Sequence, residues 1–497
     1  MRPGIGAAMR AGWPGLRPAG VAFALGALAA LGQAPLGWWW ATLAGLAGLL
    51  RLVLSRKDGR VWLGWFGGAG YFACTLNWIV EPFLIEPETH GWMAPFAVVL
   101  LSFGLALFWA VAVWAGARGR WPVAGSVLAL TVAELARGHV LTGFPWGMPG
   151  HVWVGTPVAQ VAALAGPLAL TGIVLGVAGL LAWPRPWRVA AAFAVLALAW
   201  THGAWREAQP VAGGTGVFLR LVQPNAEQGL KWDAGQARVF FDRQIAFTEA
   251  GSRPDLAIWP ETAVPYLLED YPEVGERIGK AGRGSPVAVG VQRVEGWRFW
   301  NSLAVIGPDG GVTAGYDKHH LVPFGEYIPF GDLAYRWFGL VAFAAQEGNG
   351  YSAGAGPAVL DLGPKLGKVL PLICYEAVFP QDLLDAPARA DWILQITNDA
   401  WFGEWTGPYQ HLAQARLRAI EQGLPFVRVA NTGISALIDA RGRVVESLPL
   451  GEAGYLDVEL PGPLPPTPYA RFGEWPMVLL LICGAAVLLV AGRRKAA

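Results

Sequence analysis

Apolar and polar positions divide the chain into three parts. Residues 1–205 contain long apolar runs with few acids or bases, residues 214–465 show a mixed pattern, and residues 476–492 are apolar again. A helix that spans a bilayer needs about 20 mostly apolar residues. Eight runs approach this length, at 18–32, 36–54, 61–80, 93–116, 121–137, 157–183, 187–204 and 476–492. We therefore predict an α-helical membrane bundle of about eight transmembrane helices.

The mixed region predicts strands that alternate with helices. Short apolar runs that end on polar residues favour strands, and apolar residues three and four apart favour helices. We expect strands at 217–223, 256–259, 286–291, 369–374 and 392–397, and helices at 234–249 and 408–422. This alternation indicates an α/β domain. Such domains usually place their chemistry beyond the carboxyl ends of strands, so the polar residues found there are candidates for a site.

Basic residues in the short loops set the orientation of a membrane protein. They occur at both ends of the chain and in alternate loops, as Arg2, Arg10, Arg17, Arg51, Arg56, Lys57, Arg60, Arg118, Arg120, Arg185, Arg188, Arg493, Arg494 and Lys495. With eight spans, all of them fall on one side of the membrane. We therefore predict that both termini are cytoplasmic. The expected domains are a membrane domain (1–205) with seven helices, an external domain (206–470), and a closing helix with a basic tail (471–497).

Composition narrows the functional classes. Only 15% of the residues are charged, against about 25% in a typical soluble domain. The net charge of +1 gives no sign of a nucleic-acid partner. Three scattered cysteines form neither a disulfide framework nor a cysteine-based zinc site. We expect Cys74 and Cys483, which lie in apolar runs, to be buried packing residues, which leaves Cys374 alone in the mixed region.

Three residues at strand ends or in loops have the chemistry of acyl transfer. Glu261 follows the 256–259 strand, Lys318 lies in a polar loop, and Cys374 ends the 369–374 strand. Taken singly, each has an ordinary interpretation as a solvated charge or a packing thiol. Taken together, a thiol can attack a carbonyl, a carboxylate can take its proton, and an ammonium can stabilise the oxyanion.

Two other motifs have weaker support. Residues 350–354 fit the Gly-x-Ser-x-Gly pattern of serine hydrolases, but that motif needs a strand before it and a helix after it, and we expect loops on both sides. The pair His319 and His320 raises the question of a metal, but no third ligand follows at a regular spacing, so we expect loop histidines.

The candidate segments resemble a known family. In this order, they are similar to the Glu-Lys-Cys triad of the nitrilase superfamily, and more closely to its membrane-embedded branch, the apolipoprotein N-acyltransferases. The matching segments are 222–225, 231–233, 259–263, 318–329, 373–376 and 397–403, of which 318–329 is the most diagnostic. That family has seven spans, an external nitrilase-like domain and a closing span. The resemblance therefore covers nearly the whole chain and implies an αββα sandwich for the external domain.

The resemblance also implies an activity. These enzymes transfer a fatty acyl chain from a membrane phospholipid to the α-amino group of the N-terminal S-diacylglyceryl-cysteine of an apolipoprotein. This is the last step of bacterial lipoprotein maturation, and it proceeds by a ping-pong mechanism through a thioacyl-cysteine. The implied protein is a monomer of the bacterial inner membrane with a periplasmic catalytic domain, and it requires no cofactor or metal.

The implied site residues follow from the matching motifs. Cys374 is the nucleophile, Glu261 the general base and Lys318 the oxyanion stabiliser, while Glu326 is a second carboxylate that supports Lys318. Further supporting or substrate-binding positions are Trp232, Asn301, Tyr375, Glu376, Trp401 and Phe402.

Some alternatives remain open. An apolar segment after the lysine loop is either core packing or a flap that enters the lipid and shields the site from water; it contains Leu333, Trp337, Phe338, Leu340, Val341 and Phe343. A membrane-anchored amidase or nitrilase would release its product to water, but a single anchor would suffice for it. A transporter or receptor predicts charged residues inside the spans, and Glu134 is the clear candidate.

Overall fold

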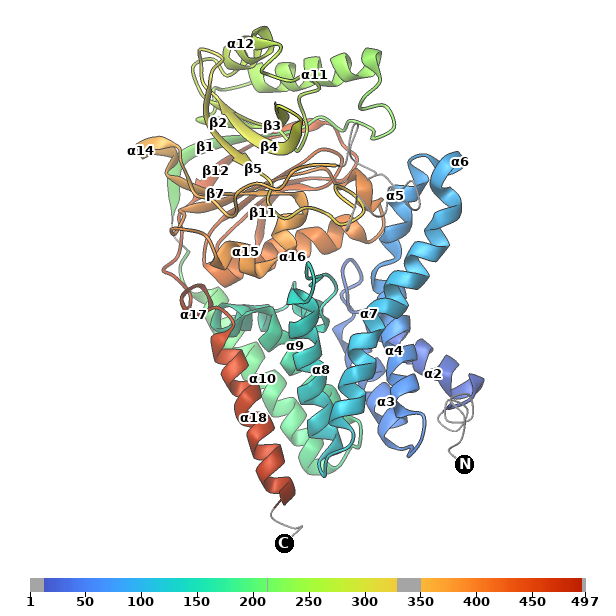
Figure 1. Ribbon diagram of the computed structural model, residues 1–497. Coiled ribbons are helices and arrows are strands. Elements are labelled where there is room, and N and C mark those ends of the chain that lie inside the picture. The colour runs from blue at the N-terminus through green and yellow to red at the C-terminus, as the bar shows by residue number, and fades with distance from the viewer. Residues whose placement is uncertain (1–12, 212, 329–349, 494–497) are drawn as a thin grey trace. The chain divides into compact units, whose positions relative to one another are not determined.

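The computed structural model describes residues 13–211, 213–328 and 350–493 (Figure 1). The chain forms two compact units. The first comprises Met1–Gln209, Trp405–Ala413 and Thr467–Ala497, and the second comprises Pro210–Glu404 and Gln414–Pro466. The residues considered above as a flap, Leu333, Trp337, Phe338, Leu340, Val341 and Phe343, lie outside the described residues.

The first unit is helical. Each of the eight apolar runs forms a helix, namely α2 (Leu16–Ala30), α3 (Trp39–Leu54), α4 (Arg60–Thr75), α7 (Ala94–Gly116), α8 (Pro122–His139), α9 (Ala162–Leu181), α10 (Pro186–Ala208) and α18 (Trp475–Arg493). Shorter elements connect them, namely η1 (Asn77–Val80), α5 (Glu81–Leu84), α6 (Pro87–His90), η2 (Gly91–Met93), η3 (Pro149–Trp153), η4 (Pro157–Val161) and α17 (Pro468–Phe472).

Fewer helices than expected meet a strict criterion for spanning. Within the described part of the chain, two helical stretches, Pro87–Gly116 and Pro157–Leu181, are long and apolar enough to cross a membrane. Leu16–Ala30, Trp39–Leu54 and Trp475–Ala491 are shorter apolar helices. The shortening has a local cause in the first two runs, because the turns between Ala30 and Trp39 take residues that a purely apolar count assigns to a helix.

Small residues allow α2 and α4 to approach closely. A Cβ atom added to Gly26 would lie 1.9 Å from the carbonyl oxygen of Gly67, and one added to Gly70 would lie 2.0 Å from that of Phe23. Only glycine fits at such contacts. Packing of this kind is typical of helices in membranes, where small residues let backbones meet.

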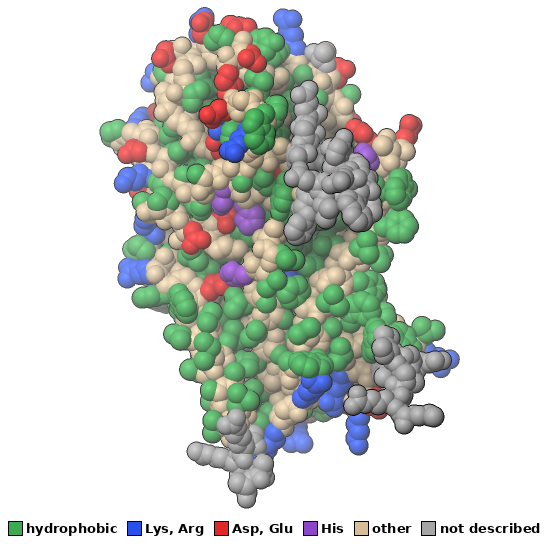
Figure 2. Space-filling view, in the orientation of Figure 1, with side chains coloured by type: hydrophobic (Ala, Val, Ile, Leu, Met, Phe, Trp, Pro, Cys, Tyr) green, Lys and Arg blue, Asp and Glu red, His purple; other side chains and the backbone are tan. Residues whose placement is uncertain are grey.

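The basic loops of the first unit lie at one end of its helices. Arg60, at the start of α4, donates a hydrogen bond to the carbonyl of Ala117 after α7. Arg51 in α3 donates to Ala182 after α9, and Arg120 before α8 donates to Ala491 near the end of α18. Figure 2 shows Lys and Arg side chains gathered at this end.

Large apolar side chains cover the outer faces of these helices (Figure 2). They include Phe96, Leu100, Leu107 and Val111 on α7, Phe193 and Leu198 on α10, and Leu479, Leu480, Ile482, Val487 and Leu489 on α18. Cys74 and Cys483 are also exposed, so the expectation that they are buried was wrong. An apolar run in sequence does not distinguish a helix face that packs inward from one that faces outward.

The charged residue noted inside a predicted span belongs to a structural network. Glu134 in α8 pairs with Arg137, and both side chains are fully buried. Trp109 donates to Glu134, and Arg137 donates to the carbonyl oxygens of Phe144 and Trp146. The pair therefore fixes the turn after α8, which gives Glu134 a role other than that of a transport site.

The second unit contains two six-stranded sheets. In spatial order, the first consists of β12 (Gly454–Pro461), β1 (Gly214–Gln223), β2 (Leu256–Ile258), β3 (Val287–Glu295), β4 (Arg298–Ile306) and β5 (Val312–Asp317). The other consists of β11 (Val444–Leu448), β10 (Ser435–Ile438), β9 (Phe426–Ala430), β8 (Trp392–Thr397), β7 (Lys368–Ile373) and β6 (Leu360–Asp361). Strands β1–β3 are parallel in one sheet and β7–β9 in the other, with antiparallel strands on both sides.

Helices cover the outer faces of the two sheets. Figure 1 shows α11 (Ala234–Glu249) and α12 (Pro272–Ala281) on one side, and α15 (Pro380–Leu384) with the second half of α16 (Gly407–Gln422) on the other. The smaller elements are α14 (Gly363–Leu366), η5 (Cys374–Val378) and η6 (Asp399–Phe402). This is an αββα sandwich, and the strands and helices predicted from the pattern are all present within a few residues.

An apolar core packs against the parallel strand that precedes Glu261. Phe241 of α11 packs edge to face on Trp259, next to β2, with ring centroids 5.7 Å apart. Both rings belong to a buried cluster that includes Val222 of β1 and Val289 of β3. The carboxyl end of β2, which precedes Glu261, is thereby packed between α11 and the neighbouring strands.

Candidate active site

Glu261 lies in a turn directly after β2. Its carboxylate accepts hydrogen bonds from the side chain of Asn301 (2.7 Å) and from the backbone N–H of Asn398 (2.8 Å). Burial, together with the charge of Glu326, raises the pKa of Glu261, while Lys318, Asn301 and Lys231 oppose the shift. A carboxylate whose pKa is raised in this way is suited to accept a proton near neutral pH.

Lys318 follows β5 and lies between two carboxylates. Its Nζ is 2.8 Å from Glu326 and 3.8 Å from Glu261, and the side chain is buried. Burial opposes the charge, but Glu326 and Glu261 raise the pKa of Lys318 above its usual value. The ammonium form of Lys318 is therefore favoured. The second oxygen of Glu326 accepts the N–H of Val322, so Glu326 holds both the lysine and its loop.

Cys374 begins η5 at the end of β7, and it is buried. Its φ of 51° is a left-handed conformation that non-glycine residues adopt rarely, and such strain is common at functional sites. The side chain of Gln395 donates to the Cys374 carbonyl (2.9 Å) and holds this conformation. Arg428 in turn bonds to both Gln395 and Asp399. The nucleophile candidate thus sits on a buried polar support.

Burial favours the protonated form of the Cys374 thiol. Burial, followed by the charge of Glu261, raises the pKa of Cys374, whereas Lys318 and a hydrogen bond with Thr397 lower it. From the sequence we expected Lys318 to favour the thiolate. The structure shows that burial outweighs this attraction, so the thiol needs a base at the moment of attack.

Glu376 joins the lysine loop to the cysteine loop. The fully buried carboxylate accepts hydrogen bonds from the backbone N–H groups of His319 (2.8 Å) and Ile373 (2.7 Å) and from the hydroxyl of Tyr316 (2.8 Å). It therefore supports the site by positioning backbone. The neighbouring Tyr375 is buried and packs edge to face on Phe379.

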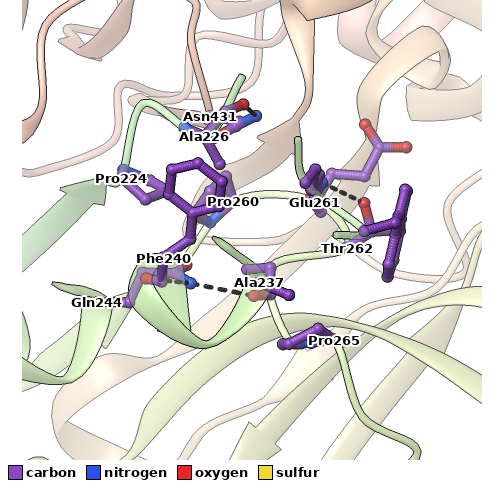
Figure 3. Close-up of a pocket in the computed structure, with 13 residues that line it drawn as sticks. Pro224, Ala226, Ala237, Phe240, Gln244, Pro260, Glu261, Thr262, Pro265 and Asn431 are labelled. Carbon is purple, nitrogen blue, oxygen red and sulfur yellow. Dashed lines mark hydrogen bonds between the residues drawn. The ribbon is translucent and has the colours of Figure 1, made fainter. Parts of the chain in front are cut away.

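The other predicted residues lie nearby on separate elements. Asn301, on β4, also donates to Glu326 (3.2 Å), so it bridges the two carboxylates. Trp232 lines a pocket beside the Glu261 turn. Figure 3 shows this pocket, with Pro260, Glu261 and Thr262 labelled in the turn. Trp401 is half-buried and Phe402 is buried in η6, shortly after Asn398.

Two contacts of Glu261 were not predicted. Asn398 donates through its backbone, and side-chain types carry no signal for such a contact. Lys231 is a second buried lysine whose Nζ donates to the Glu261 carbonyl oxygen. It lies inside one of the matching motifs, but no local pattern of residues indicates that its side chain is buried.

The two histidines of the lysine loop have a third neighbour that spacing did not reveal. Ligand atoms of His319, His320 and Asp382 lie within 4.8 Å of one another, so the group could hold a metal. Burial lowers the pKa of His319, but hydrogen bonds to Asp382 and Glu376 raise it to about 10. His319 Nδ1 lies 2.8 Å from Glu376, and its Nε2 lies 3.6 Å from Asp382, so this group also connects the lysine loop to both carboxylates.

The Gly-x-Ser-x-Gly segment also supports the lysine loop. The N–H of Tyr351 donates to the carbonyl oxygen of Glu326, and that of Gly354 donates to the carbonyl oxygen of Lys318. A Cβ on Gly354 would lie 2.1 Å from the carbonyl oxygen of Asp317. Close backbone packing thus explains this glycine, and the following residues form loop rather than helix, as expected.

Comparisons with known proteins give matches over both units. Residues 25–180 match the apolipoprotein N-acyltransferase N-terminal domain, and residues 246–464 match the carbon-nitrogen hydrolase family. The apolipoprotein N-acyltransferase of Caulobacter vibrioides is 38% identical to this chain. The alignment covers 94% of this chain and 93% of the Caulobacter protein. That of Brucella melitensis is 37% identical, with 90% and 88% covered.

Solved structures match about half of the chain. A carbon-nitrogen hydrolase superfamily protein from Xanthomonas campestris is 21% identical, with a TM-score of 0.36 over 49% of this chain and 90% of its own. An amidase from Nesterenkonia sp. is 20% identical, with a TM-score of 0.38 over 54% and 98%. Because relatives above 30% identity span nearly its whole length, the chain belongs to the apolipoprotein N-acyltransferase family.

Proposed function

We propose that this protein transfers a fatty acyl chain from a membrane phospholipid to the α-amino group of the N-terminal S-diacylglyceryl-cysteine of an apolipoprotein. The observation that carries the proposal is the buried arrangement of Glu261 and Lys318, whose charges both act on the thiol of Cys374. The family supports the same substrates, since the relatives bear the name apolipoprotein N-acyltransferase.

In the first half-reaction, Cys374 takes the acyl chain. Glu261 accepts the thiol proton while Sγ attacks the ester carbonyl carbon of the phospholipid. The carbonyl oxygen becomes an oxyanion, and the ammonium of Lys318 stabilises it. The bond to the glycerol oxygen then breaks, that oxygen receives the proton from Glu261, and a lysophospholipid leaves a thioester on Cys374.

In the second half-reaction, the α-amine of the apolipoprotein attacks the thioester carbon. This amine has a pKa of about 7.7–8.0, so part of it is neutral near pH 7. Glu261 accepts a proton from the nitrogen, and the C–S bond breaks. The departing thiolate recovers the proton from Glu261, and the product is an amide. Because Cys374 cannot hold an acyl chain and attack a second ester at once, the kinetics are ping-pong.

The lifetime of the thioester distinguishes this transfer from hydrolysis. With phospholipid alone, we expect the acyl-enzyme to persist. Adding an S-diacylglyceryl-cysteine peptide should discharge it on the order of 100-fold faster, because a bound amine has a high effective concentration. Mass spectrometry of the intact protein over time measures this rate.

Matched peptides make the test specific. The same peptide with an acetylated amine should leave the thioester intact, and so should one without the diacylglyceryl group. A lifetime that no peptide changes, with free fatty acid as the main product, would show instead a lipid hydrolase, which releases its product to water.

We also propose that the helices of the first unit form a membrane domain. Residues 1–205 would supply seven spans, 206–470 the periplasmic catalytic domain, and 471–497 a closing span of a monomer in the bacterial inner membrane. The exposed apolar faces of α7, α10 and α18 support spanning. The contacts of Arg51, Arg60 and Arg120 support a common cytoplasmic end for the basic loops.

Reporter fusions test this topology. An enzyme that is active only outside the cytoplasm should be active when fused after Gly213, and silent when fused after Lys57 or Arg494. A cytoplasm-specific reporter at the same positions should give the opposite pattern. Activity of the external reporter at Lys57 would rule out the eight-span arrangement.

A further inference from the structure

A second buried lysine lies beside the general base, and the mechanism above does not use it. Lys231 is in the loop between β1 and α11, and only 6% of it is exposed. Its Nζ donates hydrogen bonds to the carbonyl oxygen of Glu261 (3.1 Å) and to the hydroxyl of Thr262 (2.7 Å). A long flexible cation is thus fixed at the backbone of the turn that carries the base.

This turn has a conformation that needs support. Thr262 has a φ of 46°, which is rare for a β-branched residue. On one side the turn rests on Gly290, where an added Cβ would lie 2.3 Å from the carbonyl oxygen of Pro260. Gly290 also accepts the N–H groups of Ala263 (2.8 Å) and Val264 (3.2 Å). Lys231 holds the same turn through Glu261 and Thr262.

The loop that presents Lys231 is itself anchored. The amide of Asn431 accepts the N–H of Ala226 (2.9 Å) and donates to its carbonyl (2.8 Å). Asp233 caps the N-terminus of α11 by accepting two backbone N–H groups. Figure 3 shows the pocket wall that the loop helps to form, with the carboxylate of Glu261 pointing away from Phe240 and Gln244. These contacts therefore fix the position of the loop that carries Lys231.

Lys231 also contributes charge to the site. Burial lowers the pKa of Lys231 to about 8, while Glu261 and Cys374 act to raise it. Among the described residues, the titratable groups that interact with Glu261 are Lys318, Glu326, Lys231, Cys374 and Tyr351. With both lysines protonated, the charges of the two carboxylates are balanced; without Lys231, the buried site keeps one uncompensated negative charge.

We propose that Lys231 is a positioning residue for the general base. It fixes the Glu261–Thr262 turn, so that the carboxylate meets Asn301, Asn398 and Lys318, and its charge keeps that carboxylate ionised at neutral pH. The inference rests on the proposed function, because it assigns Lys231 to the proton transfer of both half-reactions.

The test is the pH dependence of acyl-enzyme formation with phospholipid alone, a step that excludes the titrating amine of the acceptor. Lys231→Met keeps the length of the side chain but loses its charge and hydrogen bonds. We expect a loss of roughly 10- to 100-fold in the rate of thioester formation, the range for one hydrogen bond to a charged group. Because the ionised form of Glu261 loses a stabilising charge, the acidic limb should move to higher pH by about one unit.

Control variants separate positioning from folding. Lys231→Arg keeps the positive charge, so its acidic limb should lie at the same pH as in the wild-type protein. This should hold even if the larger arginine side chain lowers the rate. Lys280→Met, on the exposed face of α12, should leave rate and pH profile unchanged. The KM for phospholipid and the melting temperature of each variant are measured alongside.

The outcomes distinguish this inference from the proposed function. If the wild-type protein forms no thioester, the proposed function fails. If it does, and Lys231→Met forms the thioester at the wild-type rate, or more slowly with an unshifted acidic limb, then Lys231 is not a positioning residue for Glu261.

Discussion

Replacing Cys374 with alanine is expected to abolish the acyl-enzyme. In the proposed mechanism the thioester forms on Sγ, so the variant lacks the nucleophile that attacks the ester. We expect a fall in turnover of at least about 10⁴-fold, as for other nucleophiles that act together with a base. Intact-protein mass spectrometry after incubation with phospholipid gives a direct measurement, since one acyl chain adds a defined mass.

Two matched variants accompany this test. Cys74→Ala and Cys483→Ala remove exposed thiols from α4 and α18, and both should acylate like the wild-type protein. An acyl adduct of unchanged stoichiometry on Cys374→Ala would contradict the mechanism. Loss of the adduct in Cys74→Ala alone would point to a different nucleophile.

The second large effect is expected for Glu261→Gln. Glutamine keeps the size of the side chain and can still accept the N–H of Asn398, and Glu326 still pairs with Lys318. It cannot accept the thiol proton, so both half-reactions should slow by about 10²- to 10⁴-fold, the usual contribution of a general base. Single-turnover rates of acylation and of discharge, measured separately, check that both steps are affected.

The pH dependence of thioester formation provides a second test of the role of Glu261. Glu261 acts as a base only when ionised, and burial raises its pKa. The wild-type rate of thioester formation should therefore fall as the pH decreases, at a pH above the usual range for a carboxyl group. Glu261→Gln should lose this acidic limb, because the titrating group is gone. A limb that persists in the variant would assign it to another group.

The strand ends were predictable because they combine two strong local signals. The runs before Glu261 and Cys374 are apolar and short, and each ends on a polar residue, so the pattern identifies both the strand and its candidate. Strand β11 gave no such signal, because nearly all of it is exposed at the edge of its sheet. Strand β9 is fully buried, but Arg428 interrupts its apolar run.

Contacts between distant segments account for what sequence did not reveal. Asp382 approaches His320 across 62 residues, and Asn398 meets Glu261 through its backbone across 137. Such partners depend on how two sheets pack, and no spacing rule encodes that. Asn301 lies outside the matching segments, and the pattern of β4 does not single it out, so its bridging of two carboxylates is visible only in the structure.

Burial of Cys374, which raises the pKa of its thiol, also affects how readily this residue is oxidised. Oxidants and disulfide-forming enzymes react with the thiolate, and both are abundant outside the bacterial cytoplasm. A thiol with a raised pKa presents little thiolate to them. On the proposed outer side of the membrane, Cys374 would thus resist oxidation between turnovers, since it becomes a strong nucleophile only while a bound ester lets Glu261 take its proton.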